Sequence, residues 1–190
     1  IDVFIQERKR KGNYINYSCA YALVFLLWMG SLTLAQEGVW RESLNSIVYS
    51  TSLSLDGSTA VVGTRNDGVR AYDQRGQLRW EFFPRSTVWG VSTSEDGSRT
   101  AVASEDRHIY LLDQNGQELW SFRSSRIFQD VALSRTGSSV FAVDEGKTAY
   151  FLSGETGQVL WQTTLRDTSD AIAIYGGDTV RVLVGTRGAQ

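Results

Sequence analysis

The stretch AYDQRGQLRW, Ala71–Trp80, decides the fold because the chain repeats it twice. LLDQNGQELW follows at Leu111–Trp120, and FLSGETGQVLW follows at Phe151–Trp161 with one residue added. The three tryptophans are spaced 40 and 41 residues apart, and each closes the frame GQxxW. A fixed period in the low forties, filled with short strand-like segments, is typical of proteins that build one blade per repeat.

Each repeat is expected to contain four short strands. In the first repeat, two apolar segments over 47–55 and 59–64 flank Asp56-Gly57, a pair that favours the tight turn of a hairpin. Two further segments, 69–72 and 78–83, complete the unit. The turn glycine returns every 40 residues, at Gly57, Gly97, Gly137 and Gly177. We therefore predict an all-β protein, a β-propeller of four-stranded antiparallel blades.

About three and a half blades are predicted, so the ring is expected to be partial. The full units cover 47–84, 87–123 and 127–165, a fourth unit over 169–190 holds two strands, and 38–43 is interpreted as a closing strand. Because propellers close with roughly four to eight blades, we expect the chain to be the N-terminal part of a longer protein or to need a second copy. On this interpretation the blade that faces Trp40 lies outside the chain.

The first 35 residues carry the features of an export signal. A basic run over 8–11 precedes an apolar run over 19–35, and Thr33 and Ala35 place small residues before a cleavage site. The alternative is an uncleaved N-terminal anchor, with a membrane contact only through residues 14–35. We favour cleavage. In both cases the repeats over 36–190 are expected outside the cytoplasm, in a periplasmic, secreted or cell-surface location.

The composition argues against a nucleic-acid partner and against a fold held by disulfide bonds. The formal net charge of −2 provides no basic footprint, so a nucleic-acid partner is not expected. The single cysteine, Cys19, lies in the predicted export segment. The repeats therefore have no disulfide framework and depend on their packed core.

The end of each repeat resembles the tryptophan-docking motif A-x-D-x-x-T-G-x-x-x-W of quinoprotein-like (PQQ-like) propellers. Phe151–Trp161 has the full length of the motif, whereas Ala71–Trp80 and Leu111–Trp120 are one residue shorter. The resemblance covers residues 36–190 and implies a PQQ-like, WD-like repeat. A tryptophan at this position is expected to bury its ring against a neighbouring blade rather than to stack on a ligand, and Trp89, in a first strand, is also expected to pack. The docking positions are Trp40, Gly76, Trp80, Gly116, Trp120, Gly157 and Trp161.

No catalytic or metal-binding set stands out in the sequence. His108 is the only histidine, and the HExxH, Walker-type and GxSxG patterns do not occur. Asp67, Asp106 and Asp144 recur between second and third strands, where aspartate favours turns. PQQ and calcium enter only through the family resemblance. Its dehydrogenases use adjacent cysteines, which the repeats here do not contain.

The favoured function is that of an exported, non-enzymatic scaffold that presents its loops to another protein or a small ligand. The alternative is part of a PQQ-dependent dehydrogenase, or another propeller enzyme whose active-site residues lie outside this chain. The predicted binding face consists of connections from a fourth strand to the next first strand, because each carries arginine, whose planar donor fork suits anions. The competing interpretation is that these are ordinary solvated loop residues. The arginines are Arg41, Arg85, Arg123, Arg126 and Arg166.

Overall fold

The computed structural model describes residues 40–175 and 181–186, which belong to one compact unit, Gly38–Gln190. The predicted export segment over 1–35 lies outside the described residues. Residues 40–43 form no strand, so the predicted closing strand over 38–43 is not present in its described part. Within the described ranges, no helix is long and apolar enough to cross a membrane.

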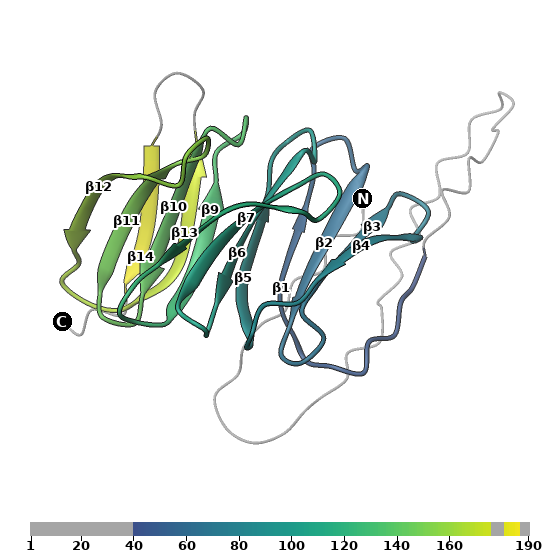
Figure 1. Ribbon diagram of the computed structural model, residues 1–190, viewed down its shortest axis with the longest axis horizontal. Coiled ribbons are helices and arrows are strands. Elements are labelled where there is room, and N and C mark those ends of the chain that lie inside the picture. The colour runs from purple at the N-terminus through teal and green to yellow at the C-terminus, as the bar shows by residue number, and fades with distance from the viewer. Residues whose placement is uncertain (1–39, 176–180, 187–190) are drawn as a thin grey trace, which may run out of the picture. The chain divides into compact units, whose positions relative to one another are not determined.

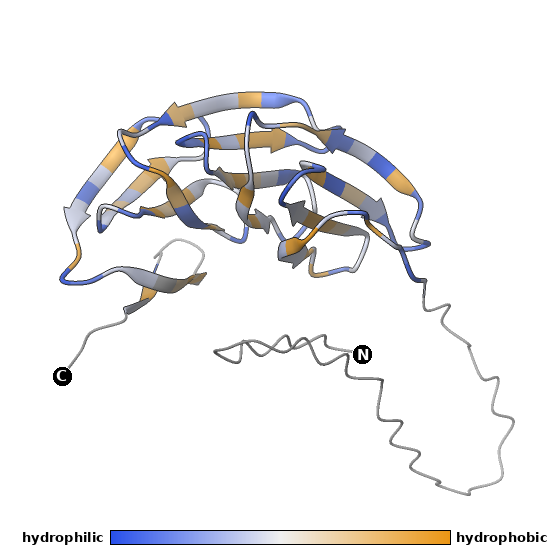
Figure 2. Ribbon diagram, turned by 90° about the horizontal axis from the view of Figure 1, so that it is seen from below, coloured by the Kyte–Doolittle hydropathy of each residue, from blue (hydrophilic) through white to orange (hydrophobic). Residues whose placement is uncertain are grey.

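The described residues form fourteen strands, each five to seven residues long and joined by short turns. Apolar positions lie along the strands and polar residues gather at the turns (Figure 2). The strands are β1 (Val48–Leu53), β2 (Thr59–Thr64), β3 (Val69–Asp73), β4 (Leu78–Phe82), β5 (Val88–Thr93), β6 (Arg99–Ser104), β7 (His108–Asp113), β8 (Glu118–Arg123), β9 (Phe128–Leu133), β10 (Ser139–Asp144), β11 (Thr148–Ser153), β12 (Val159–Thr164), β13 (Ser169–Tyr175) and β14 (Arg181–Thr186).

The strands form three four-stranded sheets and one two-stranded sheet, β13-β14, and every pairing is antiparallel. Within each sheet the strands follow chain order. The sheets stand side by side as blades, with β1, β5, β9 and β13 as neighbouring innermost strands (Figure 1). The predicted all-β propeller of four-stranded antiparallel blades is confirmed, and the described blades do not close a ring.

Apolar side chains fill the spaces between successive blades. Val69 of the first blade and Val102 of the second belong to one fully buried cluster. Leu111 of the second blade and Phe128 of the third belong to the next cluster. Burial of a side chain of this size contributes about 1.5–3 kcal/mol. The apolar residues that recur along the strands therefore also hold neighbouring blades together.

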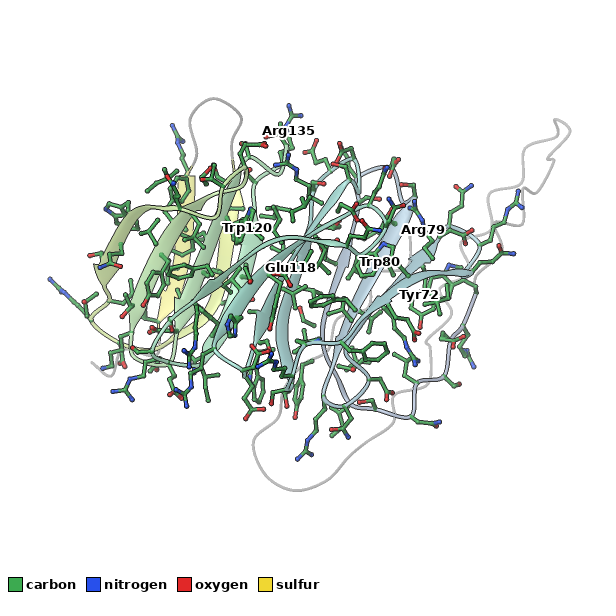
Figure 3. The ribbon with its side chains drawn as sticks, viewed as in Figure 1. Tyr72, Arg79, Trp80, Glu118, Trp120 and Arg135 are labelled. Atoms are coloured by element: carbon green, nitrogen blue, oxygen red, sulfur yellow. The ribbon has the colours of Figure 1, made fainter. Side chains whose placement is uncertain are left out.

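The tryptophans of the first two repeats each pack on a glycine turn of the following blade. A Cβ atom added to Gly116 would lie 2.8 Å from the indole of Trp80, and one added to Gly157 would lie 2.8 Å from the indole of Trp120. Both glycines have positive φ, 77° and 70°, which glycine adopts without steric cost. The two tryptophans therefore occupy equivalent joints in successive blades, and both are labelled in Figure 3.

Trp40 forms the same joint with the first blade. A Cβ atom on Gly76 would lie 2.5 Å from its indole, and its ring centroid is 5.4 Å from that of Tyr72. The expectation that the blade facing Trp40 lies outside the chain is therefore wrong, because docking runs from each tryptophan to the following blade. Trp161 is the tryptophan that meets no such turn among the described residues, and it is 51% exposed.

The indole N–H groups of the two inner joints differ. Trp120 Nε1 donates to the carbonyl oxygen of Gly154 at 2.9 Å. Gly154 belongs to the turn that is one residue longer than its counterpart over 113–116. Trp80 packs on that shorter turn, and its Nε1 is buried without a hydrogen-bond partner among the described residues. One residue of turn length thus decides whether a buried donor is satisfied.

Side-chain oxygens tie the innermost strands of neighbouring blades together. Ser52 Oγ in β1 accepts the backbone N–H of Thr93 in β5 at 2.9 Å. Forty residues later, Ser92 Oγ in β5 accepts the backbone N–H of Leu133 in β9 at 3.0 Å. These bonds satisfy backbone donors that the blade's own ladder leaves free.

A second position that can hydrogen-bond to the next blade lies two residues earlier in each innermost strand, and the residue type at this position differs from blade to blade. Ser50 Oγ forms this bond in β1, but β5 has Gly90 at the equivalent position. The carboxylate of Asp130 fills that space, since a Cβ atom on Gly90 would lie 2.8 Å from its Oδ1. Asp130 Oδ1 accepts the N–H of Val131 at 2.9 Å, and Oδ2 accepts the N–H of Ile172 in β13 at 3.2 Å. Burial raises the pKa of Asp130 to about 6, against the lowering effect of both hydrogen bonds.

Candidate binding face

The connections from fourth to first strands lie at the same end of the blades as the turns between second and third strands. Backbone hydrogen bonds join the two sets: the N–H of Glu105 donates to the carbonyl oxygen of Thr87 at 2.8 Å, and that of Glu145 to Ile127 at 2.9 Å. Arg135, in the turn between β9 and β10, lies at the opposite end (Figure 3). The sheets thus hold two sets of loops in fixed register at one end.

Four of the predicted arginines lie at this end, which we call the arginine face and define by Arg85, Arg123, Arg126 and Arg166. All four residues are exposed. The main chain around them is anchored: the N–H of Arg85 donates to Asp106 Oδ2 at 3.0 Å, and that of Arg126 to the Ser124 hydroxyl at 2.9 Å. Their guanidinium groups form no ion pair with any described residue. The face therefore presents exposed cations on an ordered main chain.

Arg41 does not belong to this face. It follows Trp40 directly, and the Trp40 indole packs on Gly76, in the turn at the other end of the first blade. By the 40-residue period Arg41 corresponds to Glu81, which lies within β4 and not in a connection. By this comparison Arg41 does not correspond to a connection between blades, although its side chain is exposed.

Asp106 lies beneath the arginine face, and its carboxylate is fully engaged. Oδ2 accepts the hydroxyl of Tyr110 at 2.7 Å as well as the N–H of Arg85, and Oδ1 accepts the N–H of His108 at 3.1 Å. Burial opposes ionisation, but these hydrogen bonds outweigh it and hold the pKa of Asp106 below its ordinary value. Asp106 is thus a charged anchor for the loop, and the ring of His108 stacks on Tyr110 beside it.

Asp144 and Glu105, two further acidic residues in turns at this end, also accept hydrogen bonds. Asp144 is 1% exposed and accepts the N–H of Thr148 at 2.8 Å and the hydroxyl of Tyr150 at 3.1 Å. Glu105 accepts the Ser86 hydroxyl at 3.0 Å. These carboxylates organise the turns, and the guanidinium groups of the arginine face are left to solvent.

No group of three or more histidine, cysteine, aspartate or glutamate side chains within residues 40–175 and 181–186 is placed to hold a metal ion.

Two features of this region were not predicted. The first is the serine and aspartate tie between innermost strands, because isolated serines in a strand carry no pattern that distinguishes an acceptor from a solvated side chain. The second is a bulge at the start of each innermost strand, which turns Tyr49, Trp89 and Gln129 away from the regular ladder. Trp89 is partly buried as expected for a packing residue, but its neighbour is Tyr49, with ring centroids 4.6 Å apart.

Antiparallel four-stranded blades joined by tryptophan–glycine contacts define a β-propeller repeat protein. A family model described as "Outer membrane protein assembly factor BamB" matches residues 34–188. Because this match covers most of the chain, the protein belongs to that family of PQQ-like propeller repeats, and the resemblance inferred from the docking motif is confirmed.

Solved structures show the same fold. The WD40 repeats of RRP9 match with a TM-score of 0.65 and 16% identity, over 76% of this chain and 54% of that one. BamB from Moraxella catarrhalis matches with a TM-score of 0.58 and 21% identity, over 70% of this chain and 42% of that one. The chain thus spans about half the length of the propellers it matches. No curated protein matches its sequence.

Proposed function

We propose that this chain is part of an extracytoplasmic propeller scaffold that binds a partner protein through the arginine face and performs no catalysis itself. The observation that carries the proposal is the arrangement of Arg85, Arg123, Arg126 and Arg166 at one end of successive blades, exposed and without ion pairs among the described residues. Loops held by a rigid scaffold are the usual place for binding residues.

The family supports both the kind of role and its location. Its description names an assembly factor for outer membrane proteins. The proposal also draws on residues 1–35, whose order of basic, apolar and small residues is typical of an export signal. We therefore assign the scaffold to the space outside the cytoplasm, with a role in the assembly of other proteins.

Electrostatics defines how such a face acts. Exposed arginines steer an acidic partner surface and set its orientation, and they contribute more to association rate and specificity than to affinity. Their planar forks bind carboxylates through paired hydrogen bonds. Binding through this face is consequently expected to weaken as salt concentration rises, because exposed charges are screened beyond about 10 Å at 0.1 M salt.

Site-specific photo-cross-linking in cells tests the proposal with the full-length protein. A photoreactive residue replaces Arg123 on the arginine face or, as the control, Arg75, which is exposed in the turn between β3 and β4 at the opposite end. We expect a discrete protein adduct from position 123 that is absent from position 75. Arg85→Ser with Arg126→Ser should reduce this adduct at least severalfold. Equal adducts from both ends, or an adduct that ignores Arg85 and Arg126, would refute the proposal.

A further inference from the structure

Each innermost strand of the described blades breaks register with its second strand at the same place. In β1 the break lies between Val48 and Ser50, in β5 between Val88 and Gly90, and β13 shows the same feature between Ser169 and Ala171. In β9 the break falls at residues 128 and 130. A bulge leaves one residue outside the ladder and re-aims its side chain. The extra residues are Tyr49, Trp89 and Gln129, each 40 residues from the next.

These side chains form a row across the blades, which we call the bulge row and define by Tyr49, Trp89 and Gln129. The rings of Tyr49 and Trp89 are tilted by 38° with centroids 4.6 Å apart, and Tyr49 is 36% exposed. Gln129 lies 40 residues after Trp89, just as Trp89 lies 40 residues after Tyr49. The strands that carry Trp89 and Gln129, β5 and β9, are neighbours. Oε1 of Gln129 is buried and accepts no hydrogen bond from any described residue.

The row lies at the end of the blades that carries the arginine face. Trp89 is four residues after Arg85, and Gln129 is three residues after Arg126, at the start of the strand that each connection enters. The backbone bonds of Glu105 to Thr87 and of Glu145 to Ile127 fix these strand starts beside the turns of the face. Guanidinium groups, an aromatic pair and a buried amide oxygen without a donor among the described residues are thus all found at one end of the blades.

A buried acceptor without a donor costs about 1–3 kcal/mol. An aromatic pair that keeps part of its surface exposed adds a flat apolar platform. The rings of Tyr49 and Trp89 meet between the first and second blades, and the exposed part of this pair is the surface that a ligand can reach. A ligand that brings a donor to Gln129 and a flat side chain to Trp89 would satisfy both.

We propose that the bulge row recognises an extended acidic peptide segment of the partner, a specificity that rests on the proposed function of the arginine face. A proline or aromatic side chain of the segment stacks on Tyr49 and Trp89. The carboxamide of Gln129, a partly exposed residue, turns outward so that Oε1 accepts a backbone N–H of the segment, and the carboxylates of the segment bind Arg85 and Arg126. A neutral saccharide would also offer donors and a flat face, but it would leave the arginines without an anionic partner.

The test uses the full-length protein and fluorescein-labelled synthetic peptides of twelve residues that alternate glutamate with proline and contain one tyrosine. Fluorescence anisotropy compares them with peptides in which lysine replaces glutamate, and a separate titration uses a neutral maltooligosaccharide. We expect the acidic peptide to bind, with an affinity that falls as salt is added, and the lysine peptide and the saccharide not to bind. Binding of the saccharide with equal or higher affinity would overturn the assignment of a peptide.

Two variants of the row and one matched control locate the contact. Trp89→Leu should weaken peptide binding about tenfold, the equivalent of 1.4 kcal/mol and the upper range of an aromatic pair. Gln129→Leu should weaken binding while raising the thermal midpoint, because it removes a buried acceptor that lacks a partner. Trp161→Leu, at a half-exposed tryptophan away from the row, should leave binding unchanged.

The outcomes separate this inference from the proposed function. If Arg85→Ser with Arg126→Ser weakens binding but Trp89→Leu and Gln129→Leu do not, the arginine face stands and the role of the bulge row is refuted. If none of these variants changes binding, both proposals fail. A loss of binding in Gln129→Leu together with a lower thermal midpoint would identify Gln129 as a structural residue and would also refute the inference.

Discussion

Asp130 makes the joint between the third blade and β13 sensitive to pH. Its pKa rises from an ordinary value of 3.8 to about 6 in the folded protein because the carboxylate is buried. Between these values the folded protein holds a proton that the unfolded chain releases, so the stabilising contribution of this group is full below about pH 4 and is lost as pH rises through about 6. The difference corresponds to about 3 kcal/mol at pH 7. This figure is an upper limit, because Asp130 keeps some exposure to solvent.

Asp130→Asn removes the titration and leaves the shape. The amide oxygen still accepts one of the two N–H groups, of Val131 or Ile172, so about 1 kcal/mol of hydrogen bonding is lost. Urea unfolding followed by tryptophan fluorescence, at several values between about pH 4 and pH 7.5, gives the free energy of unfolding of both proteins. We expect the wild-type value to fall relative to the variant by up to about 3 kcal/mol across this range. Parallel curves would refute the reasoning, because all other titrating groups are shared.

A pair of substitutions tests the geometry of the same joint. Gly90→Ser alone should destabilise the protein, since the new Cβ would lie 2.8 Å from Asp130 Oδ1 and 3.1 Å from the nitrogen of Val131. Gly90→Ser combined with Asp130→Ser should recover stability and abolish the pH dependence, because it rebuilds the tie that Ser50 makes between β1 and β5. Additive losses in the double variant would show that the two positions are not coupled.

Two further predictions concern the tryptophan joints, and both are measured by urea unfolding. Trp120→Phe should cost about 2 kcal/mol more than Trp80→Phe. The first substitution breaks the hydrogen bond to Gly154, whereas the second removes a buried N–H that has no partner among the described residues. Equal losses of stability in the two variants would contradict this prediction. Trp120→Ala should cost about 3 kcal/mol, the lower end for aromatic truncations in a core, because its indole is only partly buried. Trp161→Ala should cost less than half of that, since Trp161 is 51% exposed; a comparable loss at Trp161 would show that it is covered in the full-length protein.

The period of 40 residues predicted the blades because it is a property of the chain that packing does not alter. It could not predict the direction of docking, since a tryptophan 40 residues from its neighbours has a blade on either side. Trp40 therefore appeared to lack its partner, whereas its indole packs on Gly76 of the first blade. The same ambiguity affected Arg41, which was assigned to a blade boundary by its proximity to one. Its position relative to Trp40 does not correspond to a connection between blades.

The ties between innermost strands and the bulge row depend on register, which the sequence does not express residue by residue. Ser50 and Tyr49 are adjacent, yet one accepts a hydrogen bond from the next blade and the other is outside the ladder. Strand propensity cannot separate these two roles, because it reflects how a side chain fits a half-buried pleated surface and not the register of the pairing. Their roles follow from the bulge, and only the pairing of β1 with β2 reveals where it lies.

The difference between positions that bond to the next blade and positions outside the ladder explains how the repeats diverge along the chain. At the position of Ser50 the later repeats have Gly90 and Asp130, and these two changes compensate each other because the carboxylate occupies the space that glycine leaves. One residue earlier, the side chains are outside the ladder, and tyrosine, tryptophan and glutamine follow one another without a compensating change. Positions whose hydrogen bonds join the innermost strands are therefore constrained in pairs, whereas the bulge positions vary in chemistry from blade to blade. Bulge positions can therefore add specificity to the binding face that the arginine-bearing connections provide.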